Sequence, residues 1–361
     1  MKVLVVCTVP FEINGIVNVI MNYYTNMKSD SVKFDFIAHT NIDERLRKRI
    51  EDNGDKIFIL PNRKKSVYSY TRQLQRILED GKYDIMHVHG NSALMEIELF
   101  AARKIKIKKI VHAHNTQCTY KILNRLLYDS FMKSYDYALA CSQAAGKWLY
   151  KEHDFIVFNN SIDTRKYKFS MEKRCRMRKL LNIPDESLVI GHVGQFYAVK
   201  NQEYLLTILA NLVRRKVEAV LMLIGDGEQR HYIEQKAKEL NIYERVIFTG
   251  VTDRVQDYMQ AMDVFAMPST HEGLPLVGVE AQAAGLPCIF SDVITREMKM
   301  TETVEFLPIN IEASIWSEHI LKLYNSSDRE EGVKCIQEAG YDIKENASKL
   351  LEFYYKVANG V

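Results

Sequence analysis

The sequence predicts an α/β protein with two doubly wound domains, each a parallel sheet covered by helices on both faces. Three observations lead to this prediction. Short apolar runs alternate with longer segments whose apolar residues recur at helical spacing, from one end of the chain to the other. The runs are continuously apolar, which is typical of strands buried on both faces, and such strands belong to parallel sheets. The chain has 361 residues, which is too many for one ordinary hydrophobic core.

Seven short apolar runs are the expected strands of the first domain. They span residues 2–6, 34–38, 56–60, 84–89, 109–114, 137–141 and 155–159. Amphipathic segments such as YTRQLQRILED, residues 70–80, lie between most of them and are the expected helices. The first run is short and turns polar at once, so it indicates a buried strand and not a signal peptide. No run reaches the roughly 18 apolar residues that suggest a membrane span.

The alternation stops near residue 160 and then restarts. The stretch NNSIDTRKYKFS, residues 159–170, is rich in polar and turn residues and indicates a linker. Five further strands are expected after it, at residues 188–194, 219–225, 245–250, 263–269 and 287–291. The tail has apolar residues at helical spacing and no strand after it. The expected first domain is therefore residues 1–164 joined by a returning C-terminal helix, residues 342–361, and the second domain is residues 165–341.

The composition excludes several classes of protein. The chain is 47% hydrophobic and 26% charged, which is typical of soluble globular proteins and not of disordered or fibrous ones. Its six cysteines have no Cys-x-x-Cys spacing, which argues against a disulfide framework and against a structural zinc site. This usage of cysteine suits a reducing cytoplasm.

Positive charge is concentrated in the first half of the chain. Residues 1–164 have 24 Lys and Arg against 18 Asp and Glu, whereas the remainder has 25 against 28. The basic residues cluster in RLRKR (45–49), NRKK (62–65) and RKIKIKK (103–109). Each cluster alone is typical of a solvated helix face, but three together make peripheral contact with an anionic membrane a second interpretation. Nucleic acid is a less favoured partner, because no recognition motif accompanies the clusters.

Polar residues and glycines collect just after the expected strands, where open α/β sheets bind their ligands. The stretch HEGLPLVGVEAQAAGLP begins at His271 and has Glu272 and Glu280 eight residues apart. Pro275 marks a helix start, so Glu272 should precede that helix and Glu280 should lie about two turns inside it. A buried carboxylate needs a partner, because burying an unpaired charge costs several kcal/mol.

The chemistry of this stretch suits a ligand that has both hydroxyls and phosphates. A carboxylate can accept two hydrogen bonds from a vicinal diol, as in dinucleotide-binding folds. Gly273 and Leu274 present backbone N–H groups beside the positive end of the helix dipole. The alternative interpretation is a plain helix N-terminus with favourable acids and a tightly packed face of small residues.

This stretch is one of several motifs that occur in a recognisable order. The others are HVHGNSA (87–93), VHAHNT (111–116), CSQAAGKWL (141–149), HVGQFYAVKNQEYLL (192–206), LIGDGEQR (223–230) and VIFTGVTDRVQDYMQAMDVFAMPS (246–269). Together they resemble, across nearly the whole chain, the family 4 glycosyltransferases, in particular the branch that builds bacterial capsules, exopolysaccharides and O-antigens. The resemblance implies a retaining enzyme with the GT-B fold, in which two Rossmann-like domains face each other across a cleft. The first domain would bind the acceptor, and the second would bind the nucleotide sugar.

The resemblance also implies roles for individual residues. Glu280 would accept hydrogen bonds from the ribose hydroxyls of a nucleotide diphosphate sugar, and Glu272 would contact hydroxyls of the donor hexose. Gly273 and Leu274 would donate backbone N–H groups, and Lys200 would neutralise the diphosphate. The chain contains no Asp-x-Asp, so neither a magnesium clamp nor any other cofactor is expected. Cations and helix N-termini would stabilise the leaving diphosphate instead.

Two positions depart from the family pattern. Gln195 stands where the family commonly has an arginine that pairs with Lys200 on the phosphates. Glutamine donates hydrogen bonds but brings no charge, so another cation, such as His192, Lys200 or a basic residue of the first domain, would have to compensate. Gly15 stands where the family often has paired glycines that close on the donor phosphate. Asn14 beside it also indicates the start of a helix.

Four histidines lie near the ends of two neighbouring strands of the first domain. The family has a histidine at the position of His114, where it would polarise the acceptor hydroxyl or bond to the donor sugar. His87, His89 and His112 alternate along these strands, and such a group suggests a metal site. No cysteine or carboxylate completes a ligand set at a recognisable spacing, so histidines with satisfied hydrogen bonds are the favoured interpretation.

The sequence therefore predicts a cytoplasmic, metal-independent, retaining hexosyltransferase. Its donor would be a nucleotide diphosphate sugar, most simply a UDP-sugar, and its acceptor a glycan or a lipid-linked oligosaccharide at the inner membrane face. A nucleotide-sugar epimerase has the same architecture and is one alternative. A non-catalytic nucleotide-sugar-binding or scaffold subunit of a polysaccharide assembly complex is another, and Gln195 favours it.

Overall fold

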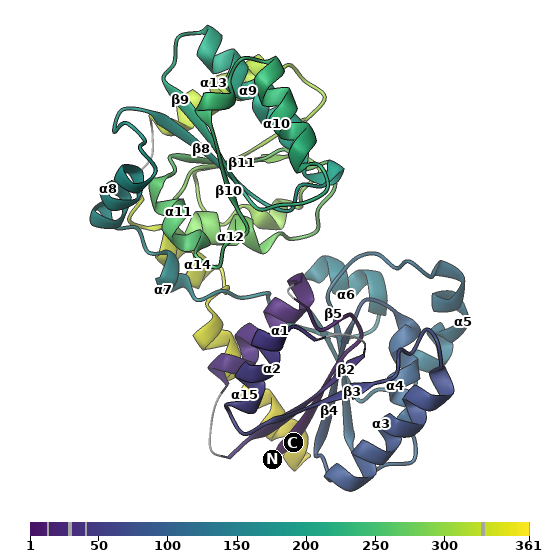
Figure 1. Cartoon of the computed structure of the whole chain (residues 1–361). Helices are drawn as coiled ribbons and strands as arrows, with labels where there is room; N and C mark the ends of the chain where they lie inside the picture. The colour runs from purple at the N-terminus through teal and green to yellow at the C-terminus, as the bar shows by residue number, and fades with distance from the viewer. Residues whose placement is uncertain (13, 28–30, 40–41, 326–328, 361) are drawn as a thin grey trace. The chain divides into compact units, whose positions relative to one another are not determined.

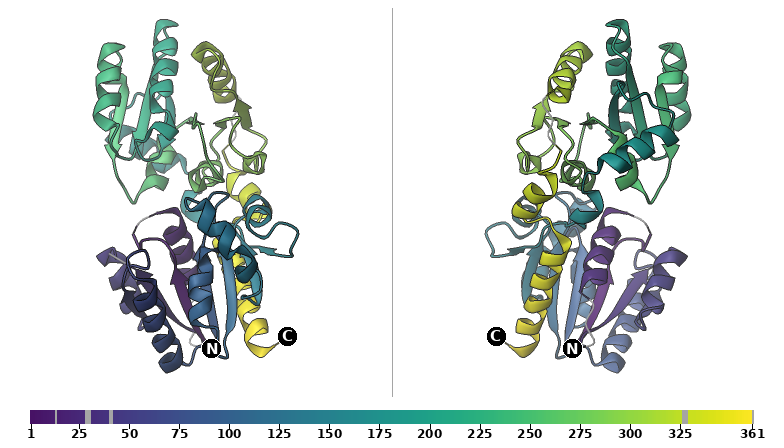
Figure 2. Two further views of the ribbon diagram at one scale, coloured as in Figure 1. Left: turned by 90° about the vertical axis from the view of Figure 1, so that its right-hand side faces the viewer. Right: turned by 90° about the vertical axis from the view of Figure 1, so that its left-hand side faces the viewer.

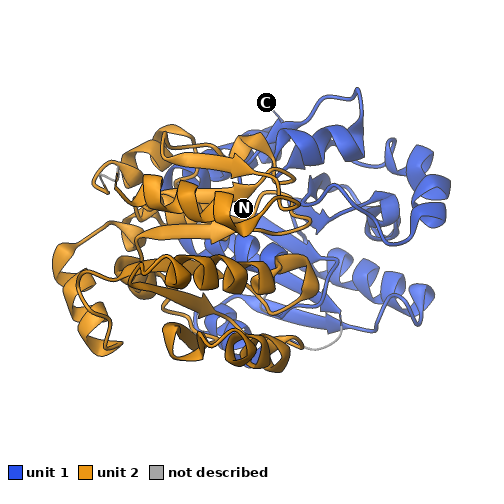
Figure 3. Ribbon diagram, turned by 90° about the horizontal axis from the view of Figure 1, so that it is seen from above, with its two compact units in different colours: residues 1–161, 343–361 blue, residues 162–342 orange. Residues whose placement is uncertain are grey.

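The computed structural model of the chain describes residues 1–12, 14–27, 31–39, 42–325 and 329–360. The chain forms two compact units, one from Met1–Ser161 with Ile343–Val361 and the other from Ile162–Asp342 (Figure 3). The first crossing between the units lies between Ser161 and Ile162, close to the boundary expected at residue 164. The C-terminal helix belongs to the first unit, as the fold prediction requires.

The first unit contains a seven-stranded parallel sheet with helices on both faces (Figure 1). All seven expected strands are present, and their order in the sheet is β3-β2-β1-β4-β5-β6-β7. The strands are β1 (Lys2–Cys7), β2 (Lys33–His39), β3 (Lys56–Leu60), β4 (Ile85–Gly90), β5 (Lys108–Ala113), β6 (Tyr137–Ala140) and β7 (Ile156–Val157). The helices are α1 (Gly15–Asn26), α2 (Glu44–Glu51), α3 (Val67–Gly81), the 3-10 turn η1 (Ala93–Met95), α4 (Glu96–Ala101), α5 (Lys121–Phe131), α6 (Gln143–Tyr150) and α15 (Ile343–Asn359).

Side chains of alternate strand residues point to the two faces of this sheet. Val6 and Val88 pack on one face in a buried cluster with residues of α3, α4 and α6, among them Leu74. The other face is covered by α1 and α15. Helix α1 begins where its cap predicts, because the side chain of Asn14 accepts a hydrogen bond from the Val17 N–H at 3.1 Å.

The C-terminal helix α15 lies along the sheet of the first unit in both views of Figure 2. Its Tyr354 hydroxyl lies 2.6 Å from Nδ1 of His87 in β4. The ring of Phe353 packs edge-on against Tyr137 of β6, with 5.5 Å between the ring centroids. The C-terminal helix therefore packs directly against strands β4 and β6 of the first unit.

The second unit contains a six-stranded parallel sheet in the order β10-β9-β8-β11-β12-β13. The strands are β8 (Leu188–Val193), β9 (Ala219–Ile224), β10 (Val246–Gly250), β11 (Val264–Met267), β12 (Cys288–Ser291) and β13 (Val304–Leu307). The helices are α7 (Thr164–Tyr167), α8 (Met171–Leu180), α9 (Gln202–Arg214), α10 (Arg230–Glu239), α11 (Val255–Ala261), α12 (Leu276–Ala283), α13 (Ala313–Tyr324) and α14 (Gly332–Glu338), with 3-10 turns η2 (Ala198–Lys200), η3 (Tyr243–Arg245) and η4 (Arg296–Met298). Two buried clusters, one on each face of the sheet, form its core.

Five of these six strands were expected from the sequence, and β13 was not. It lies at the edge of the sheet beside β12, and only Val304 of its four residues is fully buried. Its Glu305 carboxylate forms an ion pair with Lys322 of α13 and a hydrogen bond with His319 of the same helix. An edge strand with a charged side chain lacks the continuous apolar pattern by which the other strands were recognised.

A buried ion cluster anchors α8 to the sheet of the second unit. Asp263 accepts hydrogen bonds from Arg174 and Arg178 at 2.6 Å each and from the Val189 N–H at 2.7 Å. Arg178 is 1% exposed, and its guanidinium also donates to the carbonyl oxygen of Ala261. Removal of the carboxylate would leave this guanidinium buried without its counter-ion.

The surface of the first unit has basic and apolar regions. The basic cluster at residues 45–49 lies in α2, and that at 62–65 lies in the turns before α3. Helix α5 exposes large apolar side chains instead, with Ile122 81% and Leu126 73% exposed. Among the described residues, no helix is both long and apolar enough to span a lipid bilayer.

Candidate active site

The strand order of each unit places a ligand site at one point of its sheet. In the second unit, the chain winds outward from β8 through β9 to β10 and then returns to β11 on the other side of β8. Ligands of open α/β sheets bind outside the carboxyl ends of the two strands at which the winding reverses. The residues that follow β8 and β11 are therefore the candidates, and they include Gln195, Lys200 and Glu272.

The loop after β8 packs closely against its surroundings. Gly225, which follows β9, has φ +132°, and a Cβ there would lie 2.1 Å from the carbonyl oxygen of Gly194. A Cβ at Gly194 would lie 3.4 Å from Cδ and Cε of the Lys200 side chain. The lysine stem therefore passes directly over the glycine of the loop.

Lys200 and Glu272 form an ion pair that joins the loops after β8 and β11. The Ser269 hydroxyl donates to the same Glu272 oxygen at 3.2 Å, and the Thr270 N–H donates to the carbonyl oxygen of Val199 at 2.8 Å. Both charged side chains are partly exposed, Lys200 at 19% and Glu272 at 16%. From the sequence, Lys200 and Glu272 were expected to bind different groups of one ligand. In the structure they also contact each other directly.

Glu280 lies in α12 and has a partner that the sequence analysis missed. Burial raises the pKa of Glu280 above its usual value, and a hydrogen bond from the Tyr167 hydroxyl opposes that shift. Tyr167 ends α7, in the stretch interpreted from sequence as a linker. The helix begins at Leu276, directly after Pro275. Glu280 is therefore little more than one turn inside α12, and the prediction of two turns was wrong.

The remaining candidates of the second unit lie in the loops after β8 and β11. Gln195 and Gly273 are exposed, and Leu274 packs partly buried against one of the hydrophobic clusters. Gly273 and Leu274 precede the first turn of α12, as expected. A Cβ added at Gly273 would have no atom of another described residue, its chain neighbours aside, within 4 Å. The main chain at this position is therefore open to a ligand.

His192 does not supply the missing charge. It is fully buried in β8, and its Nδ1 lies 2.9 Å from the carbonyl oxygen of Ala266. Burial lowers the pKa of His192 to about 4, with the hydrogen bond to Ala266 opposing and the charge of Lys200 adding to the shift. A neutral imidazole cannot replace an arginine on a diphosphate, so the suggestion that His192 compensates for Gln195 is wrong.

In the first unit, Gly15 and His114 occupy the carboxyl edge of the sheet. Gly15 is the first residue of α1, and the described structure leaves open space where a Cβ would stand. His114 directly follows β5 instead of ending it, and its Nε2 lies 2.9 Å from Nδ1 of His89. Burial lowers the pKa of His114 to about 3, so its imidazole is neutral at ordinary pH.

A pocket of about 390 Å³ opens at the corresponding switch point of the first unit, beyond β1 and β4. Its lining combines basic, hydroxyl and apolar side chains. The lining residues are Thr8, Val9, Arg63, Lys64, Val67, Asn91, Ser92, Leu94, Ile97, Cys118, Thr119, Tyr120 and Leu123. The Lys64 ammonium lies 5.6 Å from the centroid of the Tyr120 ring, and Arg63 pairs with the buried Glu98 at 2.7 Å.

The interpretation of the other three histidines was partly wrong. His87, His89 and His112 are 0%, 6% and 1% exposed. His87 and His89 each have a hydrogen-bond partner on Nδ1. Within the described part of the chain, however, neither ring nitrogen of His112 has one, and Nε2 of His87 has none either.

Comparison with known proteins identifies the family of the chain. Residues 13–166 match the family described as Glycosyltransferase Family 4, and residues 173–339 match the family described as Glycosyl transferases group 1. The chain is 31% identical over 356 residues to EpsF of Bacillus subtilis (strain 168), whose name places it among the glycosyltransferases. That match covers 94% of this chain and 93% of EpsF.

Two further matches are more distant. The chain is 26% identical over 235 residues to the UDP-Gal:alpha-D-GlcNAc-diphosphoundecaprenol alpha-1,3-galactosyltransferase of Escherichia coli, covering 61% of this chain and 60% of that enzyme. The fold of the present chain matches the crystal structure of Anabaena Alr3699/HepE in complex with UDP. The TM-score is 0.81 and the sequence identity 18%, over 99% of this chain and 100% of the other. The chain therefore belongs to the glycosyltransferases of family 4 and has the two Rossmann-like parallel sheets of the GT-B fold.

Proposed function

We propose that this glycosyltransferase moves a hexose, with retention of anomeric configuration, from a UDP-sugar to a glycan or a lipid-linked oligosaccharide in the synthesis of a cell-surface polysaccharide. The observation that carries the proposal is the ion pair between Lys200 and Glu272 at the switch point of the second unit. This pair places the Lys200 ammonium, which can bind phosphates, beside the Glu272 carboxylate, which can accept hydrogen bonds from hydroxyls. The names of the relatives support the substrate classes, with UDP-Gal and a diphosphoundecaprenol acceptor for the E. coli enzyme and UDP in the Anabaena complex.

The two glutamates would bind opposite ends of the donor. Glu280 accepts hydrogen bonds from the ribose hydroxyls, and the Tyr167 hydroxyl keeps its carboxylate in place. Glu272 accepts from hydroxyls of the hexose. The ligand would separate Lys200 from Glu272 and replace the interaction that each side chain loses with one of its own. Each partner then meets the group that its charge suits.

The diphosphate would be bound without a metal ion. Lys200 provides a full positive charge, and the N–H groups of Gly273 and Leu274 add partial charges beside the start of α12. Gln195 adds hydrogen-bond donors and no charge. The proposed leaving-group site therefore has one cation where the family usually has two, which predicts slow chemistry rather than weak recognition of the nucleoside.

The reaction would use the leaving phosphate as its base. The acceptor oxygen forms a bond to the anomeric carbon on the face from which the diphosphate departs. The bond between that carbon and the phosphate oxygen breaks with its electron pair, and the hydroxyl proton moves to that oxygen. His114, with a pKa of about 3, is too weak a base to retain the proton. We therefore assign His114 an orienting role and no proton transfer.

The pocket of the first unit would bind the acceptor. It lies at a switch point, where α/β units bind ligands, and its hydroxyl and amide groups suit sugar hydroxyls. Lys64 at its edge suits a phosphate of a lipid-linked substrate. The exposed Ile122 and Leu126 of α5 lie on either side of the lining residue Leu123 in the chain, and Lys121 and Arg125 precede each of them directly. Apolar side chains with basic neighbours are typical of a surface that rests on anionic lipid.

We therefore propose that the protein works in the cytoplasm, with peripheral contact to the inner membrane face. We propose that the pocket rim and α5 contact the membrane, in place of the three basic clusters considered from the sequence. The cluster at 62–65 adjoins the pocket through Lys64. Arg45, in the cluster at 45–49, is already paired with Asp43 at 2.8 Å.

One experiment tests the function and its alternatives. Purified protein is incubated with a panel of UDP-sugars, with and without extracted membrane lipids, and the products are separated and identified by mass spectrometry and NMR. Transfer with an α-linked product from an α-linked donor supports the proposal, and added Mg²⁺ or Mn²⁺ should not accelerate it. Product from the donor alone would indicate an epimerase. Binding without any turnover across the panel would indicate the scaffold that Gln195 favours.

A further inference from the structure

Four histidines form a cluster on one face of the sheet in the first unit. His87 and His89 are two residues apart in β4, so their side chains share a face. The parallel register pairs His89 with His112 of β5, and His114 continues the same face just beyond that strand. The rings lie close together, with centroids 4.0 Å apart for His87 and His89 and 4.4 Å apart for His112 and His114.

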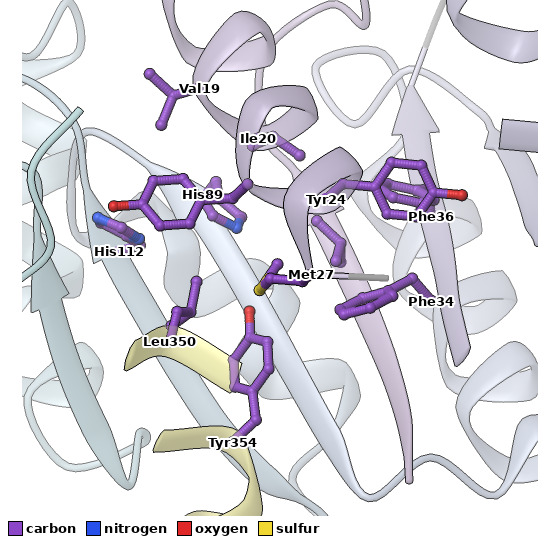
Figure 4. Close-up of a pocket in the computed structure, with 12 residues that line it drawn as sticks. Val19, Ile20, Tyr24, Met27, Phe34, Phe36, His89, His112, Leu350 and Tyr354 are labelled. Carbon is purple, nitrogen blue, oxygen red and sulfur yellow. The ribbon is translucent and has the colours of Figure 1, made fainter. Parts of the chain in front are cut away.

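This cluster is buried and lies beside a small cavity. Figure 4 shows His89 and His112 next to one another at the wall of the cavity, with the Tyr354 hydroxyl of α15 pointing into it. The cavity has a volume of about 20 Å³, which is enough for one water molecule or one ion. The other lining side chains are almost all apolar, among them Val19, Ile20 and Leu350.

The ring nitrogens of the cluster are poorly satisfied by the protein. Among the described residues, four buried nitrogens have no hydrogen-bond partner: Nε2 of His87, Nδ1 and Nε2 of His112, and Nδ1 of His114. A buried polar atom without a partner destabilises the folded protein unless a ligand binds it. Burial lowers the pKa of His87, His89 and His112 well below the usual value, with the neighbouring imidazoles adding to the shift. Neutral imidazoles keep the lone pairs that metal ions bind.

The hydrogen bonds that do exist are those that metal-bound histidines require. When a histidine binds a metal through one ring nitrogen, its other ring N–H usually donates a hydrogen bond to a fixed partner. That hydrogen bond sets the tautomer and the orientation of the ring. Nδ1 of His87 lies 2.6 Å from the Tyr354 hydroxyl, and Nδ1 of His89 lies 2.9 Å from Nε2 of His114. In both residues Nε2 is thereby left as the nitrogen for a metal ion.

From these observations we propose that His87, His89 and His112 bind one divalent transition-metal ion, most simply Zn²⁺, with water in the cavity as the fourth ligand. One candidate ligand atom from each of the three residues lies within 4.8 Å of the other two. Tetrahedral zinc with nitrogen at about 2.0–2.1 Å needs these atoms ~3.3 Å apart, so the proposal requires the rings to move closer together when the metal binds. Three imidazoles and a water are a common zinc ligand set.

The metal would have a positioning role in this enzyme. It would join β4 to β5 and, through Tyr354, to the C-terminal helix. Metal on Nε2 of His89 leaves the proton on Nδ1, which donates to Nε2 of His114 and so fixes the tautomer of that residue. The site lies in the first unit, whereas the proposed diphosphate site lies in the second, so the inference is independent of metal-free catalysis at the diphosphate.

The test measures metal content and thermal stability of the full-length protein without an affinity tag. We expect about one zinc per chain by inductively coupled plasma mass spectrometry, a higher Tm for zinc-loaded than for chelator-treated protein, and visible absorption of a tetrahedral site on loading with Co²⁺. His112→Phe should abolish all three, whereas His153→Gln, which changes an exposed histidine of the same unit, should keep them. His87→Gln provides a second ligand variant if His112→Phe does not fold.

Two results would overturn the proposal. The wild type could prove metal-free, with no change of Tm on addition of Zn²⁺ or Co²⁺, in which case the cavity holds water alone. Alternatively, His112→Phe or His87→Gln could take up as much metal as the wild type and the His153→Gln control, which would place the metal elsewhere.

Discussion

Replacement of Glu280 by glutamine removes one charge from the proposed ribose site and keeps its shape. A hydrogen bond to a charged acceptor contributes about 1.5–3 kcal/mol, and the neutral amide oxygen retains part of it. For two ribose hydroxyls we expect a net loss of about 2–3 kcal/mol, which is ~30-fold to ~150-fold in the Kd for UDP. The carboxylate is partly buried, so water cannot easily replace the lost interaction.

The assay is isothermal titration with UDP and with 2′-deoxy-UDP, on the wild type and on Glu280→Gln. If Glu280 binds the 2′-hydroxyl, a ligand without that hydroxyl should bind the wild type more weakly. The same change in the ligand should have much less effect on binding to Glu280→Gln. Glu318→Gln changes an exposed carboxylate of α13 in the same unit and serves as the control. Full additivity of the two changes would show that Glu280 and the ribose do not interact.

The same residue predicts a dependence on pH. The pKa of Glu280 is raised by burial, and the ribose hydroxyls are proposed to need its charged form. Affinity for UDP should therefore be constant at higher pH and should fall as the pH drops through the raised pKa, above the usual range of a glutamate. In Glu280→Gln this part of the pH profile should disappear. An unchanged profile would mean that another group titrates.

Three further predictions concern other parts of the molecule. Gln195→Arg should raise turnover or affinity for the diphosphate, measured by steady-state kinetics, and no gain would show that a single cation is enough. Asp263→Ala should lower the free energy of unfolding by about 3–5 kcal/mol in urea denaturation, because it leaves the buried Arg178 unpaired; a loss below ~1 kcal/mol would refute this account. Sedimentation with anionic vesicles should decrease with rising salt and fall further in the double variant Ile122→Ser, Leu126→Ser, and salt-insensitive binding would point to apolar insertion alone.

Most of the fold could be predicted from the sequence, because strands that are buried on both faces consist of uninterrupted apolar runs. Of the thirteen strands in the described part of the chain, twelve were recognised in this way. The thirteenth, β13, lies at an edge and carries Glu305, so it lacks that signal. Expected strands were often too long by one or two residues at an end, as for 263–269 against Val264–Met267, since strand ends are the least defined part of a sequence pattern.

The candidate site was less accessible to sequence reasoning. The positions of Lys200, Glu272 and Glu280 after strands or in a following helix could be inferred from motif order. The hydrogen bond between Glu280 and Tyr167 could not, because Tyr167 lies more than a hundred residues away in a stretch without periodicity. The unpartnered nitrogens of His112 are likewise a property of packing between elements, and no local pattern reports them.

The return of α15 to the first unit has a practical consequence for dissecting the enzyme. A fragment ending at Ser161 would lack the helix that covers one face of its sheet, and it would expose His87, Tyr137 and their neighbours to water. We expect such a fragment to aggregate when expressed alone. Residues 162–342, by contrast, form one uninterrupted segment with its own core, so this half is the sensible choice for production in isolation and for crystallisation with nucleotides.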